Sequence, residues 1–89
     1  MQSKSLTSAQ LRAARALIRW SAEDLARETV LSVATIRRAE LSDSETSMTA
    51  ANDLAVRRAL EMAGVEFIDE NGGGPGVRLR RPPQGKQRK

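Results

Sequence analysis

The sequence predicts a mainly α-helical fold, in which four helices are followed by a C-terminal β-hairpin and a disordered basic tail. Between residues 7 and 63 apolar side chains recur about every 3.6 residues, and each such segment begins after a Ser or Thr that can cap a helix. The period changes to two in the segments 65–68 and 77–80, which enclose a glycine-rich loop. Residues 82–89 begin with two prolines and continue with mostly polar and cationic side chains, which is typical of disorder.

The composition limits the classes of function. Eighty-nine residues form one small domain with a thin core, because the chain has one Phe, one Trp and no Tyr. We therefore expect a homodimer, in which a second copy helps to bury apolar surface. The chain has no Cys and no His, which excludes zinc fingers, disulfide scaffolds and thiol or imidazole catalysis. We expect a protein that is not an enzyme and that needs no metal and no cofactor.

The apolar residues also argue against a membrane protein. No apolar run approaches the roughly 20 residues that a membrane span needs. Three arginines, Arg12, Arg15 and Arg19, interrupt the N-terminal region, so we expect no signal peptide. A cytoplasmic protein without a membrane partner is the resulting prediction.

The net charge of +4 is unevenly distributed. Residues 78–89 hold six cations and no acid, whereas the residues before them hold nine cations and eleven acids. The basic tail could follow a nucleic-acid backbone or enter a minor groove. An end of the chain that only improves solubility is an equal alternative.

The first helix is predicted at residues 8–19. Thr7 and Gln10 fit a capping box, in which each side chain accepts a hydrogen bond from the other residue's backbone amide. The inward stripe of this helix consists of Leu11, Ala14, Arg15 and Ile18, with Leu17 beside it and Trp20 just past its end.

Two short helices follow. Ser21 caps the helix 22–29, whose first turn holds two carboxylates that suit the positive end of the helix dipole. Ser32 caps the next helix, which runs from residue 33 to about residue 41. Residues 30–31 form a turn between them that is too short for an antiparallel arrangement. Ala22, Leu25, Ala26, Thr29, Ile36, Ala39 and Glu40 are the residues predicted to face inward.

The fourth helix is predicted at residues 50–63, after a polar and acidic loop and a cap at Thr49. Gly64 is a suitable residue to end it. The residues expected to be buried along this helix are Leu54, Ala55, Val56, Ala59, Leu60, Met62 and Ala63.

The hairpin joins the segments 65–68 and 77–80 through the loop 69–76. This loop is rich in glycine, but a strand rather than a helix follows it, so a hairpin loop is favoured over a phosphate-binding loop. A two-stranded hairpin is marginally stable alone. It should pack on the helices, pair with a second copy of the chain, or both. The apolar residues proposed for this contact are Val65, Phe67, Val77 and Leu79.

Two charged residues lie on faces that should be apolar. Arg15 is within the stripe of the first helix, and Glu40 lies on the inward side of the third. Charged side chains seldom face a core unless they are paired. We expect the two residues to form an ion pair that sets how these helices cross. In the alternative, Arg15 extends to the edge of the stripe and Glu40 merely ends its helix.

Residues 21–40 have the layout of a helix-turn-helix, which presents its second helix to the major groove of DNA. Together with the expected ion pair, this segment resembles the phage-repressor and Cro-like (XRE-type) helix-turn-helix family. The residues that match the family pattern S-x-E-x-L-A…S-x-x-T-I-x-R-x-E are Ser21, Glu23, Leu25, Ala26, Ser32, Thr35, Ile36, Arg38 and Glu40. The resemblance covers Leu6 to about Gly64. It implies a repressor-like helix-turn-helix domain at 1–64, followed by the hairpin at 65–81 and the tail at 82–89.

The resemblance also implies which residues contact DNA. Arg38 is the candidate for a base contact, because a guanidinium group pairs with O6 and N7 of guanine, and Val33 and Ala34 could contact thymine methyl groups. Arg37 and the hydroxyl groups of Thr35 and Ser32 are candidates for phosphate contacts. The residues at the start of the preceding helix, Ser21 and Ala22, are further candidates.

Two positions depart from the family. Val30 stands where the family commonly has Gly, and a β-branched residue is poorly suited to a positive φ. We therefore expect another turn geometry or a longer second helix. Asp43 and Glu45 lie in a loop that is often basic in relatives, where acids would repel a DNA backbone.

Two functions agree with these features. The first is a sequence-specific transcription regulator that binds double-stranded DNA, in the form of a bacterial or phage repressor that binds a palindromic operator as a homodimer and occludes it. Such a protein would be associated with the nucleoid when bound. The alternative is a module of the same fold that binds a protein partner, of the antitoxin or antiactivator type, with weak or no DNA binding. The acidic loop motivates this alternative.

Overall fold

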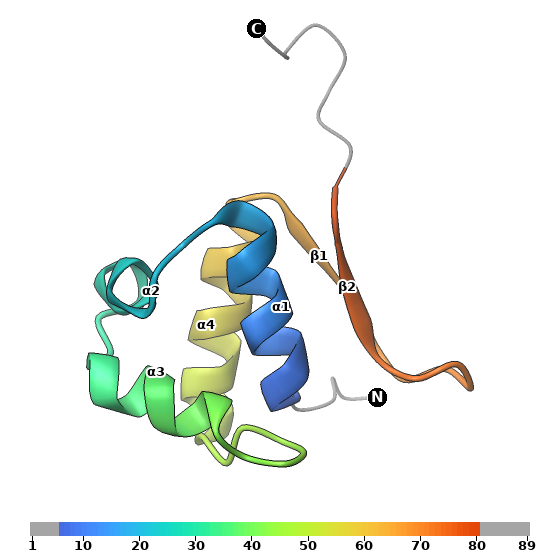
Figure 1. Cartoon of the computed structure of the whole chain (residues 1–89), viewed down its shortest axis with the longest axis horizontal. Coiled ribbons are helices and arrows are strands. Elements are labelled where there is room, and N and C mark those ends of the chain that lie inside the picture. Colours follow the sequence, from blue (N-terminus) through green and yellow to red (C-terminus); the bar gives the residue numbers. More distant parts are fainter. Residues whose placement is uncertain (1–5, 81–89) are drawn as a thin grey trace, which may run out of the picture.

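The computed structural model describes residues 6–80 and consists of four helices and one antiparallel hairpin. The elements are α1 (Ser8–Ile18), α2 (Ala22–Thr29), α3 (Val33–Glu40), α4 (Ala50–Met62), β1 (Val65–Ile68) and β2 (Gly76–Leu79). The predicted mainly helical fold is confirmed at this level. The hairpin contacts both α1 and α4, and α2 and α3 lie on the other side of the molecule, with α2 against α4 and α3 against α1 (Figure 1). The predicted tail at 82–89 lies outside the described residues.

Helix α1 begins and ends as its sequence predicts. The Gln10 amide donates to Thr7 Oγ1 at 3.0 Å and the Thr7 amide donates to Gln10 Oε1 at 3.0 Å, which completes the capping box. At the other end Arg19 adopts a left-handed conformation with φ 59°. The Trp20 amide then donates to the Arg15 carbonyl at 3.0 Å, the long hydrogen bond of a Schellman motif.

The core joins one apolar face of each helix to the inner face of β1. Its largest fully buried apolar residues are Leu6, Leu11, Leu25, Ile36, Val56, Leu60 and Val65. In α4 the predicted burial of Leu54 and Met62 is wrong, because these side chains are 45% and 88% exposed, and Ala63 is exposed as well. Val56 defines the inner face of α4, and at about 100° per residue Leu54 lies roughly 160° away from it. The apolar residues of α4 surround the helix, whereas only one side of it contacts the body.

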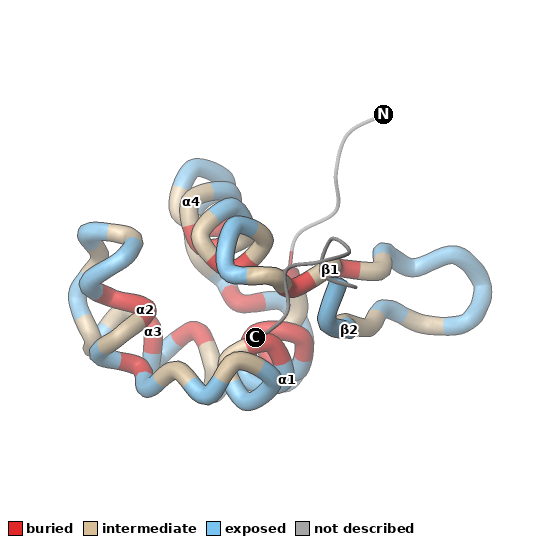
Figure 2. Tube along the Cα trace, turned by 90° about the horizontal axis from the view of Figure 1, so that it is seen from above, coloured by how far each residue is buried: buried red, intermediate tan, exposed pale blue. Residues whose placement is uncertain are grey.

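The hairpin packs on α1 and α4 through one face. Val65 pairs with Leu79, and Phe67 pairs with Val77, in an antiparallel register. Val65 is fully buried and Phe67 is nearly so. Figure 2 shows buried positions along β1, in contrast to the exposed hairpin loop. The Arg57 guanidinium lies 5.3 Å from the centroid of the Phe67 ring, which covers β1 from the side of α4.

Gln10 connects the hairpin to α1. Its Nε2 atom donates to the carbonyl groups of Ile68 at 3.2 Å and of Gly76 at 3.1 Å, one on each strand. The same side chain accepts the Thr7 amide in the capping box. One buried amide therefore caps α1 and satisfies two carbonyl groups next to the hairpin loop.

The loop between α3 and α4 is bound to the start of the chain. The Ser8 amide donates to the Ser44 carbonyl at 2.7 Å, and the Thr46 amide donates to the Leu6 carbonyl at 3.1 Å. The Thr46 hydroxyl group donates to Asp53 Oδ1 at 2.6 Å, and both side chains are buried. Burial raises the pKa of Asp53, and the hydrogen bond from Thr46 opposes that shift.

Candidate functional site

The candidate site is built on α2, α3 and the turn between them. Ser21 caps α2 by a second capping box, in which Ser21 Oγ accepts the Asp24 amide at 3.0 Å and Asp24 accepts the Ser21 amide at 2.9 Å. Ser32 caps α3 by accepting the Thr35 amide at 3.0 Å. Ala22, Leu25, Ala26, Ile36 and Ala39 are the residues that these two helices bury. Ala34, Arg37 and Arg38 of α3 remain exposed.

The turn differs from the expectation at Val30. This residue has φ 63° and ψ 22°, so it adopts the left-handed conformation that the sequence argued against. Its side chain is 92% exposed, and the next residue, Leu31, packs against the core. With two residues in the turn, a left-handed residue lets both flanking helices bury their apolar faces. The packing of α2 and α3 therefore overrides the local preference of a β-branched residue.

Arg15 and Glu40 form the expected ion pair. Arg15 Nε donates to Glu40 Oε2 at 2.6 Å and Nη2 donates to Oε1 at 2.8 Å, so the guanidinium group and the carboxylate meet as two parallel forks. Arg15 Nη1 also donates to the Trp20 carbonyl at 2.7 Å, and Arg12 Nη1 donates to the Glu40 carbonyl at 2.5 Å. The hydrogen bonds to Glu40 raise the pKa of Arg15. The pair joins the end of α3 to α1, and the alternative of an unpaired Arg15 is wrong.

The outer face of α3 presents two arginines next to small side chains. Ala34, Arg37 and Arg38 are exposed and Val33 is half-buried. Arg37 Nη2 donates to Glu23 Oε2 at 2.8 Å, and these two side chains are 60% and 55% exposed. Within residues 6–80, Arg38 makes no ion pair. The charge of Arg37 is therefore neutralised by Glu23, whereas the charge of Arg38 is available to a binding partner.

Glu23 also belongs to the candidate site. Its place in the first turn of a helix indicated an interaction with the helix dipole, but not its contact with Arg37. A hydrogen bond from its own backbone amide and the Arg37 guanidinium lower the pKa of its carboxyl group, so it is ionised at neutral pH. It lies in the first turn of α2, and Arg37 lies in the last turn of α3. The positions are fourteen residues apart on different helices. Neither the helical period nor the family pattern indicates that they meet.

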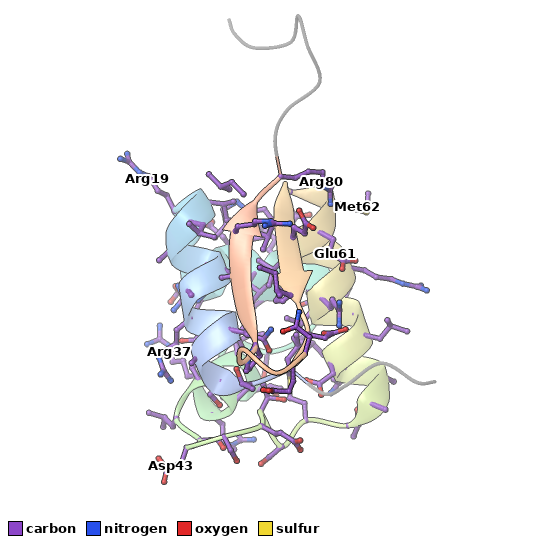
Figure 3. The ribbon with its side chains drawn as sticks, turned by 90° about the vertical axis from the view of Figure 1, so that its right-hand side faces the viewer. Arg19, Arg37, Asp43, Glu61, Met62 and Arg80 are labelled. Carbon is purple, nitrogen blue, oxygen red and sulfur yellow. The ribbon has the colours of Figure 1, made fainter. Side chains whose placement is uncertain are left out.

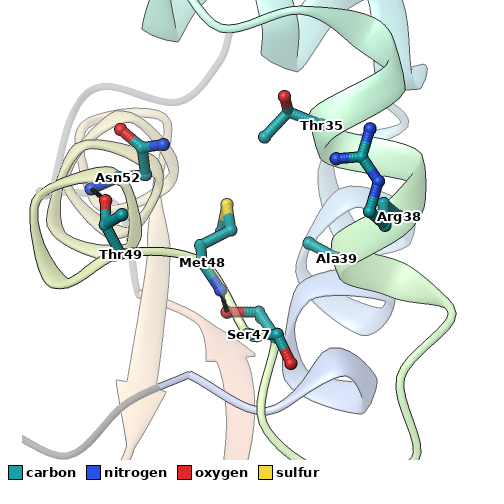
Figure 4. Close-up of a pocket in the computed structure, with 8 residues that line it drawn as sticks. Thr35, Arg38, Ala39, Ser47, Met48, Thr49 and Asn52 are labelled. Carbon is teal, nitrogen blue, oxygen red and sulfur yellow. Dashed lines mark hydrogen bonds between the residues drawn. The ribbon is translucent and has the colours of Figure 1, made fainter.

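A cleft of about 250 Å³ lies between α3 and the start of α4. Thr35, Arg38, Ala39, Thr46, Ser47, Met48, Thr49 and Asn52 line it. Figure 4 shows Thr35 and Arg38 on one wall, Thr49 and Asn52 on the other, and Met48 between them. The exposed lining is of mixed polarity, with Met48 and Ala39 beside hydroxyl and amide groups, and it carries one cation, Arg38.

The ends of the molecule differ in charge and polarity. Arg37 and Asp43 lie towards one end of the molecule, and Arg19, Arg80 and Met62 lie at the other (Figure 3). Asp43 and Glu45 are exposed in the loop after α3. The acids predicted to disfavour a DNA backbone are thus at the surface and close in sequence to the arginines of α3.

The four hairpin residues proposed for a dimer contact have different environments. Val65 and Phe67 lie in the core of their own chain, so their side chains are not available to a second copy. Val77 packs partly against the same core, and Leu79 is 52% exposed. Of the four residues, Leu79 is therefore the one whose side chain is most available to a second copy.

Comparison with known proteins identifies no relative. No protein-family model matches the chain, and no curated protein matches its sequence. Between residues 6 and 80 no helix is long and apolar enough to cross a membrane. In the same part of the chain, no three His, Cys, Asp or Glu side chains are placed to hold a metal ion.

Proposed function

We propose that this protein is a sequence-specific DNA-binding regulator of the repressor and Cro-like helix-turn-helix type. The observation that carries the proposal is the exposed face of α3, where Arg38 has no ion pair among residues 6–80, on a helix that Arg15 and Glu40 hold at its C-terminal end. An α-helix fits a major groove about 12 Å wide. The short turn at Val30 and the capped starts of α2 and α3 support the same assignment.

The proposed contacts are those that the family resemblance implies, and Ala22, whose side chain is buried, would contribute only its backbone amide. Arg38 would donate to O6 and N7 of a guanine, and the methyl groups of Val33 and Ala34 would contact thymine. Arg37 would contact phosphate. The other proposed phosphate contacts are Ser21, Ala22, Ser32 and Thr35, which lie at the starts of α2 and α3.

One copy of α3 contacts only a few base pairs. A homodimer would double the contacts and bind a palindromic site whose half-sites are about one helical turn apart. Repression by occlusion would then need no further domain. Such a protein acts where DNA is, which places it in the cytoplasm and on the nucleoid of a bacterium.

The direct test is selection of bound sequences from a random duplex library, followed by fluorescence anisotropy with the selected duplex. Arg38→Ala should cost about 1–3 kcal/mol of binding on the selected duplex and relax preference at one base pair. On random duplexes the same substitution should have a much smaller effect. Arg19→Ala is the matched control, because Arg19 is a second exposed arginine and lies at the end of the molecule away from Arg37 (Figure 3). Equal losses on both kinds of duplex would contradict a base contact by Arg38.

The alternative function is a module of this fold that binds a protein partner. The exposed acids Asp43 and Glu45 and the neutralisation of Arg37 by Glu23 favour it. A mobility-shift assay at low salt distinguishes the two functions. If no duplex is retarded and the chain forms a stable complex with a protein partner, the alternative is supported and the DNA-binding proposal is wrong.

A further inference from the structure

We propose that Glu23 is an internal competitor of DNA phosphate, which holds Arg37 in an ion pair that a phosphate group must displace. This inference rests on the proposed DNA-binding function and deepens it. It assigns to Glu23 the role of lowering affinity for every duplex, regardless of sequence.

The geometry of the pair makes exchange possible. Arg37 Nη2 and Glu23 Oε2 are 2.8 Å apart, and more than half of each side chain is exposed. An ion pair at such a surface contributes little to folding stability, because water and salt screen it. Opening the pair therefore costs the fold little, and a phosphate oxygen can take the place of the carboxylate on the same guanidinium group.

Glu23 differs from its neighbour Asp24 in what it does for α2. The Asp24 carboxylate accepts the Ser21 amide at 2.9 Å and pairs with Arg27 at 2.5 Å, so it belongs to the helix itself. The partner of Glu23 lies on a different helix, and that partner is a proposed phosphate contact. Glu23 thus joins the two surfaces that would lie along the DNA backbone.

Besides competing with phosphate for Arg37, the Glu23 carboxylate would also repel a phosphate group near the start of α2. The start of α2 is the positive end of the helix dipole, and its first turn also holds the Glu23 carboxylate. A phosphate group that approaches this end of the helix meets a negative charge at close range. The carboxylate remains ionised at neutral pH, because its pKa is lowered.

The experiment is a double-mutant cycle on the full chain, measured by anisotropy against the selected duplex and a random duplex over a range of salt concentrations. The proteins are the wild type, Glu23→Gln, Arg37→Ala and the double variant. Glu28→Gln is the matched control, because Glu28 is an exposed carboxylate on the same helix with no ion pair among the described residues. Thermal unfolding of each variant confirms that the fold is retained.

Glu23→Gln should raise affinity for both duplexes by about the same factor, on the order of fivefold at low salt. The slope of log affinity against log salt should stay close to that of the wild type, because Arg37 neutralises the same phosphate in both proteins. Glu28→Gln should change affinity less than twofold. In the Arg37→Ala background the gain from Glu23→Gln should be much smaller.

The outcomes separate this inference from the function on which it rests. Unchanged or weaker binding by Glu23→Gln, with a wild type that binds, would overturn the inference alone. A gain that persists fully without Arg37 would also overturn it, because Glu23 would then act by repulsion without competing for that arginine. If neither the wild type nor Glu23→Gln binds any duplex at low salt, both the inference and the proposed function are wrong.

Discussion

Backbone conformation at single residues reveals where the chain is strained. Three residues other than glycine have a positive φ in the described part of the chain: Arg19, Val30 and Ser47. Arg19 and Val30 end α1 and α2, and Ser47 lies in the loop before α4. Val30 is the least suited of these residues, since its branched Cβ crowds the backbone in the left-handed region. The turn of the candidate site thus contains the most strained of the three positions.

Val30→Gly should stabilise the protein by about 1 kcal/mol, because glycine takes a positive φ without steric cost. The side chain is almost fully exposed, so its loss removes little packing. Urea unfolding measures the effect. Val30→Ala is the control and should give a smaller gain, since alanine keeps a Cβ. A destabilised Val30→Gly variant would show that the Val side chain makes a contribution that its exposure does not indicate.

The ion pair of Arg15 and Glu40 is a second feature at this scale. Arg15→Met should destabilise the fold by about 2–4 kcal/mol, because it leaves the mostly buried Glu40 carboxylate without its partner. The double variant Arg15→Met with Glu40→Leu should recover much of this loss. Chemical unfolding of the three variants gives the coupling energy. Additive losses would show that the two residues do not act as a pair.

At the scale of elements, polar side chains connect separate segments of the chain. Gln10 joins α1 to both strands of the hairpin, and Thr46 joins the loop after α3 to Asp53 in α4. These contacts decide how the hairpin and the loop are placed. Each of them can be changed without removing a core residue.

Gln10→Glu should loosen the hairpin while it preserves the cap of α1. A carboxylate can still accept the Thr7 amide, but it cannot donate to the carbonyl groups of Ile68 and Gly76. We expect a loss of about 1–3 kcal/mol in stability. Hydrogen exchange should accelerate in the hairpin amides more than in those of α1. Uniform acceleration over both elements would contradict a local tether.

The raised pKa of Asp53 predicts the direction in which folding stability changes with pH. Its pKa is raised in the folded state, so folding favours the protonated form and the ionised form costs stability above the folded pKa. Asp53→Asn, which can still accept the Thr46 hydroxyl, should be more stable than the wild type at pH 7. The difference should shrink as the pH falls through the folded pKa towards the ordinary value of about 3.9. Melting temperatures of both proteins between about pH 3 and pH 7, a range that includes the ordinary pKa of Asp, measure this difference in stability. A difference that is independent of pH would contradict it.

At the scale of the whole molecule, the proposed DNA contact and the proposed dimer contact lie towards different ends. Arg37 of α3 lies towards one end, and Arg80, which follows Leu79 in the chain, lies at the other (Figure 3). The two short strands leave a half-exposed apolar side chain at that end. A dimer formed there would keep both copies of α3 free to bind DNA.

The proposed dimer predicts different effects for two hairpin residues. Leu79→Gln should weaken self-association several-fold in sedimentation equilibrium, because it removes exposed apolar surface, and should leave the fold intact. Val65→Ala should instead lower stability by about 1–3 kcal/mol, since Val65 is fully buried in its own chain. A wild type that is monomeric at every concentration would contradict the dimer, although not the DNA contact of a single copy.

The sequence alone determined what depends on neighbours in the chain. The four caps, the presence of the hairpin and the pairing of Arg15 with Glu40 all followed from spacing and residue type. The pair was predictable because a charge on an apolar face needs an opposite charge, and few candidates were available.

Only the tertiary structure decided which apolar residues of α4 face the core, that Val30 takes a left-handed conformation, and that Glu23 meets Arg37. These features depend on how elements distant in sequence pack against one another. Burial of the faces of α2 and α3 outweighs the conformational preference of one valine, because several buried side chains contribute more than one strained residue costs.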